Sequence, residues 1–333
     1  MDVSTVLGGI RKMSGRTFAL LKENDPLILA SSTAFFATFS ISPIIVLLVG
    51  ALSSVFKSAN IRQQLFHSIQ TTLGKKPTAE IESFVNNFIS LESTNTWITI
   101  GVSLFLLFVA TTLLGIVRKA IHQVWNIRRK SAVNFRYNLK ERLIGLVMLS
   151  VMGMLFLVSL VLDASVVAVQ NFTQDVIPAI DSTLVRALNI LFSVVIVTVW
   201  FMILFKILPE AHVHWKVAFA GGLLTSVLFN IGKFILGVIL KESRLESIFN
   251  TSASITLILL FIFYSSLIMY FGAAFTHSYA ELIGKPIHAG KYADEYEERS
   301  IGETKSKKTT SAALSKRNPN QNKNKNRPQA STA

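Results

Sequence analysis

Long apolar runs without charged residues alternate along this chain with shorter segments that carry nearly all of its charge. No Asp, Glu, Lys or Arg occurs between Pro26 and Phe56, between Ser93 and Val117 or between Ser247 and Ala280. A helix needs about 20 mostly apolar residues to cross a membrane, and its backbone polar groups must be satisfied within it. The runs predict six transmembrane helices, at about residues 27–55, 97–117, 143–162, 187–205, 217–240 and 254–276.

The predicted fold is therefore an all-α polytopic membrane protein. Strands of a membrane barrel would alternate apolar and polar residues, and runs such as LFLLFVATTLL do not. Very apolar core helices of a soluble protein are the other interpretation, but a composition of 51% hydrophobic and 16% charged residues favours the membrane. We expect a cytoplasmic segment at 1–26, a transmembrane domain at 27–285 and a basic, largely disordered tail at 286–333.

The positive charge is distributed unevenly between the two sides of these spans. Most of the 33 Lys and Arg residues fall in segments 1–26, 118–142, 206–216 and 277–333, whereas segment 163–183 has none. The positive-inside rule then predicts that both termini are cytoplasmic. The net charge of +14 is explained by this topology and by attraction to anionic lipid headgroups, the expected partners. A nucleic-acid partner is not expected, because no known binding module is present.

Three segments outside the spans also show patterns. Residues 1–24 have the apolar and basic sides of an interfacial amphipathic helix, with a disordered leader as the alternative. Ile61, Leu65, Ile69 and Leu73, followed after a Gly-Lys-Lys-Pro break by a second helical pattern at 81–89, predict two short amphipathic helices. They would cap the outer end of the bundle or lie on the outer leaflet. From about Glu303 the tail has no apolar periodicity, which is typical of disorder.

The fifth predicted span contains one charged residue, Lys233. A charge inside a span usually faces a cavity or a partner, because its burial costs at least ~2.5–3.5 kcal/mol. On a helix Lys233 shares a face with Asn230, Ser226 and Gly222, at spacings of three or four. This small, polar stripe is a candidate substrate pathway in which Lys233 binds an anionic group. The alternative is a structural pair or a snorkelling lysine.

The first and fourth predicted spans supply three further pathway candidates. Pro43 removes a helix hydrogen bond, so a kink or break near Phe39–Ser42 is expected. Ser42 ends a face of small residues that suits either helix packing or a pathway lining. Asn189 is a polar residue near one end of the fourth span, where an interhelical hydrogen bond is the alternative role.

Enzyme signatures are weak in this sequence. The chain has no cysteine, so thiolate chemistry and disulfides are excluded. His212 and His214 stand close together near Glu210, which makes only a poor metal site. No HExxH, P-loop or GxSxG motif occurs. We therefore expect no catalytic residues, no metal and no cofactor.

Four stretches of the chain resemble the YihY/BrkB family of membrane proteins. They are TAFFATFSISPI, RKAIHQVWNIRR, GGLLTSVLFNIGKFILGVI and LESIFNTSASITLILLFIFYSSLIMYFGAAF, and the resemblance covers roughly residues 15–285. It implies a six-helix bacterial inner-membrane protein with cytoplasmic termini, whose expected activity is transport or lipid handling. The family was once mislabelled ribonuclease BN, and nothing in this sequence supports a nuclease site.

Individual positions follow the family pattern only in part. Ser40 and Pro43 match a Ser-x-x-Pro element, Trp125 matches a tryptophan after the second span, and Gly232-Lys233 matches a Gly-Lys of some members. The chain departs from the family at Phe249-Asn250, where Tyr-Gly is common. It departs again at Gly272-Ala273-Ala274, where Gly-Ala-Glu is common. Without that carboxylate, Lys233 needs another partner.

Two functions are compatible with these observations. The first is a transporter or lipid-handling protein for an anionic or lipid-like substrate, with a cavity lined by the first and fifth spans and Lys233 as its anchor. The second is a membrane scaffold that organises envelope partners through the basic inner loop and the tail.

Overall fold

The structure is a computed structural model, and it describes residues 3–55, 59–73, 75–92, 96–130, 140, 142–155, 158, 182–242 and 253–296. Helices form most of the described chain. They are α1 (Val3–Glu23), α2 (Pro26–Val55), α3 (Ala59–Leu73), α4 (Lys75–Glu92), α5 (Thr96–Val124), α7 (Ser182–Ile207), α8 (Trp215–Glu242) and α10 (Ala253–Leu282), with a shorter apolar helix at Arg142–Leu155.

Five helices of the described chain are long and apolar enough to cross a membrane: α2, α5, α7, α8 and α10. They coincide with five of the six predicted spans. The helix Arg142–Leu155 occupies the start of the remaining span, predicted at 143–162, and most of the rest of that span lies outside the described residues. A mostly helical protein with several membrane-spanning helices is therefore confirmed, and the sixth span stays a prediction.

The turn between α1 and α2 is built from Asn24 and Asp25. Asn24 closes α1 by donating its side-chain amide to the carbonyl of Leu20, at 2.8 Å. Asp25 has a φ of +44° and its carbonyl accepts the first amides of α2, from Ile28 at 2.9 Å and from Leu29. Pro26 then suits the first helical position, where its missing N–H costs nothing. The helix α1 is thus joined directly to the helix of the first predicted span.

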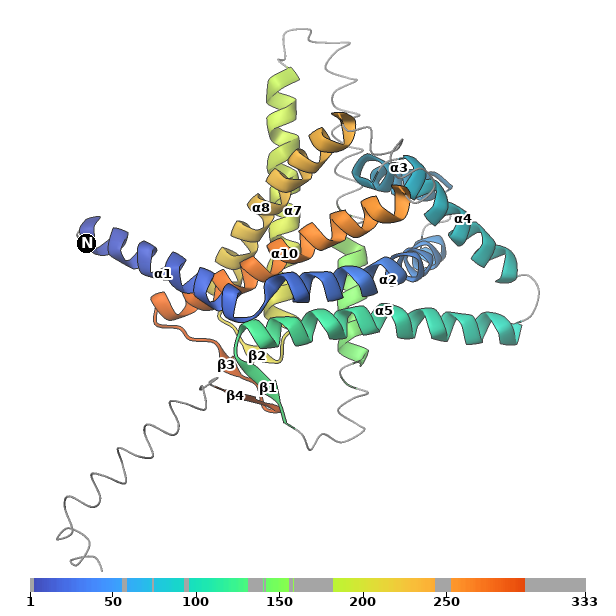
Figure 1. The fold of residues 1–333 in the computed structure, drawn as a ribbon. Coiled ribbons are helices and arrows are strands. Elements are labelled where there is room, and N and C mark those ends of the chain that lie inside the picture. Colours follow the sequence, from blue (N-terminus) through green and yellow to red (C-terminus); the bar gives the residue numbers. More distant parts are fainter. Residues whose placement is uncertain are drawn as a thin grey trace, which may run out of the picture. The chain divides into compact units, whose positions relative to one another are not determined.

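α10 is the helix around which the others pack. It contacts α2, α8, α1 and α5, and it lies between α2 and α8 in Figure 1. The larger cluster of buried apolar residues follows it and includes Tyr270, Ala273 and Ala274, each with no exposed area. The expected cavity between the first and fifth spans is therefore interrupted, because α10 packs against both of them.

The helices α3 and α4 cover the opposite end of the bundle from the turn at Asp25. Leu65 on α3 and Val85 on α4 are buried in a second apolar cluster together with Ile45 on α2 and Ile258 on α10. The residues with helical spacing in the predicted first outside loop are thus the ones that pack on the spans. Of the two predicted locations, this favours a cap on the bundle.

Large apolar side chains on the outer surfaces of the spans remain exposed. Examples are Phe39 on α2, Phe105 on α5, Ile190 on α7 and Phe234 on α8, each more than half exposed. A soluble protein rarely exposes so many large apolar residues, because they would associate in water. Lipid chains provide the natural surroundings for this surface.

Two short antiparallel strand pairs join the ends of the spans. β1 (Ile127–Arg129) pairs with β4 (Ala293–Glu295), and β2 (Ala211–His212) pairs with β3 (His288–Ala289). The amide of Gly290 also donates to the carbonyl of Glu210 at 2.9 Å. Sequence reasoning did not predict these strands. They connect the segments after α5, after α7 and after α10, which the charge distribution had assigned to one side.

One further expectation differs from the structure. α2 is a single helix through Pro43, so the expected interruption does not take the form of a break. After α10 the chain forms β3 and β4, which belong to the compact unit Met1–Glu295. The predicted domain boundaries, including the tail boundary at 286, stay predictions. The residues from Glu303 onward lie outside the described part of the chain.

Candidate functional site

The small, polar stripe of α8 packs against α7. A Cβ on Gly222 would come within 2.8 Å of the backbone of Thr198 and Met202. The Ser226 hydroxyl donates to the carbonyl of Val194 at 2.8 Å, and Ser226 has no exposed area. Asn230 accepts a hydrogen bond from Ser193 at 3.0 Å. These residues satisfy one another across a helix interface, which is the usual role of small and polar residues between spans.

Lys233 does not share that interface. Its side chain is exposed on the outer side of α8, one residue from Phe234, which is 73% exposed. The adjacent Gly232 instead faces α10, where a Cβ would overlap the ring and hydroxyl of Tyr264. The structure therefore separates Lys233 from the stripe with which the sequence grouped it, and a lysine in this position can extend its amine along the helix towards water.

The other pathway candidates do not gather into one site. Pro43 is buried and Ser42 is half-buried on α2, within the part of that helix that packs on its neighbours. Asn189 belongs to α7, and its side chain lies outside the described part of the structure. Their roles in a pathway stay predictions.

α8 and α10 meet through two matched pairs of glycine and threonine. Thr225 on α8 packs on Gly272 of α10, and Thr276 on α10 packs on Gly221 of α8. Each threonine hydroxyl donates to the carbonyl four residues earlier in its own helix, at 2.6 Å. The two helices are thus in close contact at both pairs. This interface between α8 and α10 serves packing and leaves no room for a ligand.

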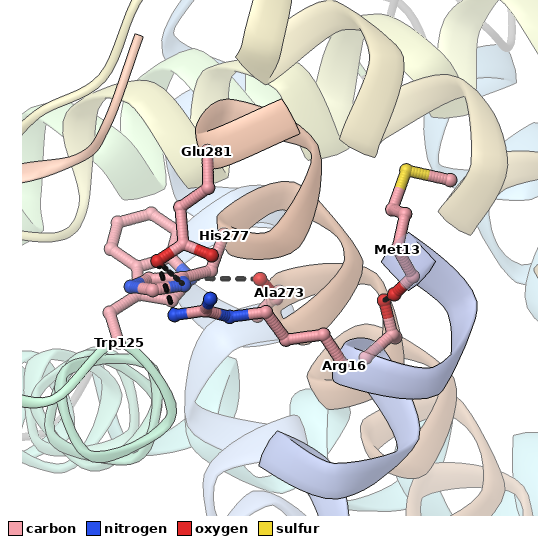
Figure 2. Close-up of polar contacts among 7 residues, drawn as sticks. Met13, Arg16, Trp125, Ala273, His277 and Glu281 are labelled. Carbon is pink, nitrogen blue, oxygen red and sulfur yellow. Dashed lines mark hydrogen bonds and ion pairs between the residues drawn. The ribbon is translucent and has the colours of Figure 1, made fainter. Parts of the chain in front are cut away.

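A polar cluster joins α1, α10 and Trp125, the residue that follows α5, near the ends of these helices. Figure 2 shows Arg16 of α1 reaching Glu281 of α10, at 2.5 Å between Nη2 and Oε1. His277 Nδ1 lies 4.0 Å from the same carboxylate oxygen. Trp125 donates its indole N–H to the carbonyl of Ala273, at 2.9 Å. Because Arg16 is half exposed, the ion pair contributes at most about 1 kcal/mol, and the cluster serves to position α1.

The strand pairs form a second polar junction at this end of the molecule. His122 accepts the backbone N–H of Glu210 at 2.9 Å. Lys285 Nζ lies 3.1 Å from His214 Nε2. The pKa of His214 is lowered from its ordinary value by desolvation and then by the positive charges of Lys285, Lys216 and Lys206. His214 therefore favours the neutral form, in which its ring can accept a hydrogen bond from the lysine.

A basic cavity lies between α5 and the helix Arg142–Leu155. It has a volume of about 310 Å³. Its lining contains three cationic residues and no carboxylate among the described residues; the lining consists of Thr111, Thr112, Leu114, Gly115, Ile116, Arg118, Lys119, Arg142 and Gly145. Arg118 is only 7% exposed, whereas Lys119 and Arg142 are exposed. The cavity therefore concentrates positive charge beside the apolar surface of two helices.

Two features of the cavity hold its shape. The guanidinium of Arg142 lies over the ring of Phe108, 4.4 Å from the centroid, which fixes the side chain by a cation–π contact. Gly115 leaves open space, since a Cβ there would meet nothing within 4 Å. Thr111, Gly115 and Lys119 are spaced four residues apart on α5, so they share one face. The cavity is thus lined by one continuous face of α5.

Sequence reasoning had counted Arg118, Lys119 and Arg142 only within the basic segment 118–142 and had not placed them in a site. The spacing of Thr111, Gly115 and Lys119 could have indicated a small, polar face within an apolar span. The opposite wall could not be inferred, because it comes from a separate helix. In the described part of the chain, no group of three or more His, Asp or Glu residues is placed to bind a metal.

Comparisons with known proteins place the chain among bacterial membrane proteins. The family model "Virulence factor BrkB" matches residues 17–294. A UPF0761 membrane protein of Alteromonas mediterranea is 24% identical over 274 residues, covering 82% of this chain and 89% of the relative. A UPF0761 membrane protein of Idiomarina loihiensis is 25% identical, covering 67% and 73%. One of Azotobacter vinelandii is 25% identical, covering 73% of this chain and 57% of the relative. No solved structure matches the chain.

Proposed function

The chain belongs to the virulence factor BrkB family of multi-pass bacterial membrane proteins, and on this premise we propose that it handles an anionic, lipid-like substrate. The observation that supports the proposal is the basic cavity between α5 and Arg142–Leu155. Its lining carries the exposed cationic side chains of Lys119 and Arg142, which can bind a negative group, and the buried Arg118 beside them. In this proposal the protein binds and moves the substrate without covalent chemistry.

The surroundings of the cavity support a lipid rather than a soluble anion. The two helices that form it carry exposed apolar side chains, among them Leu104, Phe105 and Phe108 on α5 and Leu143 and Val147 on the other helix. Basic pockets between spans on the cytoplasmic side are typical binding sites for anionic headgroups. The charge distribution predicts that this end of α5 is the cytoplasmic end. Acyl chains can then follow the apolar surface while the phosphate occupies the cavity.

Lys233 is not needed as the anion anchor in this proposal. It does not line the cavity, and it lies on α8, whereas the cavity belongs to α5 and its neighbour. The proposal therefore keeps the substrate class that the sequence predicted and assigns a different site to it.

The test is lipid binding by the full-length protein in vesicles, with matched charge changes. The double substitution Lys119→Gln and Arg142→Gln removes two charges from the cavity. The control Arg128→Gln and Lys216→Gln removes two charges from exposed residues that do not line it. Hydrogen bonds to charged groups are worth about 1.5–3 kcal/mol each, so we expect the cavity variant to bind anionic lipid at least tenfold more weakly than the control.

The outcome also separates this function from the scaffold hypothesis. If both variants bind anionic lipid as wild type does, the cavity is not a binding site and the proposal fails. If both lose binding equally, the total basic charge of this side is responsible, as an electrostatic scaffold requires. The exposed side chains of Arg128, Arg129 and Lys130 would then be the next residues to replace.

A further inference from the structure

The polar cluster in Figure 2 combines a titratable ring with the ion pair that joins α1 to α10. We propose that His277 and Glu281 bind a proton in acidic solution, and that this proton releases the first half of α1, residues 3–16, from α10. The inference goes beyond lipid binding and does not depend on the basic cavity. It combines the geometry of the ion pair, two buried atoms without a hydrogen bond and the packing of α1.

The carboxylate of Glu281 uses only one of its two oxygens in the cluster. Its Oε1 lies 2.5 Å from Arg16 Nη2, whereas its Oε2 is buried and has no hydrogen-bond partner in the described part of the chain. His277 Nδ1 is likewise buried without a partner among the described residues, 4.0 Å from Oε1. This distance is too long for a hydrogen bond. The ring therefore does not donate to the carboxylate in this arrangement.

A proton on His277 would complete these contacts. Both ring nitrogens of a protonated histidine are donors, so Nδ1 can donate to Glu281 after a small movement of either side chain. Histidine is the side chain that ordinarily changes its charge between about pH 5 and 8. Proton uptake then gives both buried atoms a partner, and Glu281 no longer depends on Arg16 to balance its charge.

Three charged groups act on the ring of His277. They are Glu281 on the same helix, Arg16 on α1 and Glu295 on β4. Burial of the ring opposes a positive charge, and the two carboxylates favour it. Glu295 is held in place by β3, where it accepts the backbone N–H of Ala289 at 3.1 Å. Of the three groups, Arg16 is the one that a charged ring repels.

The second half of α1 is firmly packed on the bundle. Thr17 and Leu20 are buried. Phe18 makes an edge-to-face contact with Phe271 of α10, with the ring centroids 5.6 Å apart. These contacts do not involve the ion pair, so this half of α1 should stay in place when the ion pair breaks.

The first half of α1 is more weakly attached. It reaches α10 through Arg16, whose side chain is 53% exposed, and through Gly9, which lies next to Leu282. Water can therefore solvate the guanidinium as soon as it leaves the carboxylate. An exposed ion pair of this kind changes an equilibrium by up to about fivefold. We expect a shift of this size between docked and released forms of residues 3–16.

The experiment measures the distance between α1 and α5 in full-length protein in lipid nanodiscs. The chain has no cysteine, so Gly8→Cys and Gln123→Cys supply the two label sites, both at exposed, uncharged positions. Spin labels are attached, and the distance distribution is recorded by pulsed electron resonance at about pH 7.5 and about pH 5.5, on either side of the ordinary histidine titration. We expect the ratio of released to docked protein to rise about fivefold at the lower pH.

Three substitutions assign this response to the cluster. His277→Gln cannot take up the proton and should give the same distribution at both pH values. The matched control His288→Gln removes an exposed histidine that lies 3.2 Å from Glu295, and it should respond as wild type does. Arg16→Gln should be released to the same extent at both pH values. Because Arg16 is half exposed, this variant also tests the proposal if His277→Gln fails to fold.

Several results would overturn the proposal. One is a wild-type distribution that does not change with pH. Another is a pH response that persists in His277→Gln or in Arg16→Gln, because a different group would then bind the proton or a different contact would hold α1. Loss of the response in His288→Gln as well would also overturn it, since the effect would not belong to His277.

Discussion

Replacing Gly272 by alanine should destabilise the bundle by separating α8 from α10. Gly272 is the position at which Thr225 of α8 comes closest to α10. A Cβ placed there would overlap the Thr225 hydroxyl and would lie 3.0 Å from the Cβ and 3.2 Å from the Cγ2 of that residue. Rotating the hydroxyl away would break its hydrogen bond to the Gly221 carbonyl and would still leave two carbon contacts closer than the usual distance.

The magnitude follows from these two costs. Losing the hydrogen bond costs about 1 kcal/mol, and forcing an extra carbon into a packed interface costs typically about 1–3 kcal/mol. We therefore expect Gly272→Ala to lower the free energy of unfolding by about 2–4 kcal/mol relative to a control alanine. The control is Gly101→Ala in α5, where a Cβ meets nothing within 4 Å. It cancels the gain of about 1 kcal/mol in helix propensity that both substitutions share.

The assay is reversible unfolding of the purified protein in mixed micelles, followed by tryptophan fluorescence. A double-mutant cycle isolates the contact: Thr225→Ala alone should cost about 1 kcal/mol, and it should relieve most of the damage caused by Gly272→Ala. Gly221→Ala, tested against Thr276→Ala, repeats the experiment at the other matched pair. Equal stability of Gly272→Ala and Gly101→Ala, or additive costs in the cycle, would refute the close packing described for this interface.

Three further predictions concern single side chains. Trp125→Phe should lower the free energy of unfolding by about 1–3 kcal/mol, because the buried Ala273 carbonyl loses its donor; Trp97→Phe, on a residue 82% exposed, is the thermal-melt control and should change little. Lys233→Met should leave lipid binding at the cavity unchanged, and a clear loss of binding in the vesicle assay would restore Lys233 as the anchor. The pKa of His214 is lowered in the folded protein, so the free energy of unfolding should decrease as the pH falls from the unfolded pKa of 6.5 to the folded pKa. His214→Gln should flatten the matching decline in melting temperature, and an unchanged decline would contradict the lowered pKa of His214.

The sequence predicted the spans because each depends on local composition. α2, α5, α7, α8 and α10 coincide with uncharged or nearly uncharged runs, and the amphipathic pattern at residues 61–89 became α3 and α4. It also predicted that the segments after α5, α7 and α10 lie on one side. The strand pairs that join these segments agree with that prediction, since hydrogen-bonded partners must lie together.

The sequence did not predict the strands or the cavity. Strands of two or three residues have too few positions to show a period, and their partners are more than 70 residues apart, as with Ala211 and Ala289. The cavity needs Arg142 to face α5 across a helix interface, which no spacing within α5 can indicate. For the same reason, shared spacing on α8 could not show that Ser226 faces α7 while Lys233 faces outward.

By itself, then, the sequence determined that this protein is a polytopic helical membrane protein, and it located the five helices that are long and apolar enough to span. The sixth span and the side to which the charge belongs stay predictions. Whether a segment spans depends on its free energy of transfer from water to lipid. That free energy is set almost entirely by the composition of the segment itself. The tertiary structure decided which faces meet, where Lys233 lies and where cations converge. Lipid chains are as apolar as the helices, so partners are selected by shape and hydrogen bonds, as at Gly272 and Thr225. Such complementarity exists only between two surfaces, and only the folded chain brings them together.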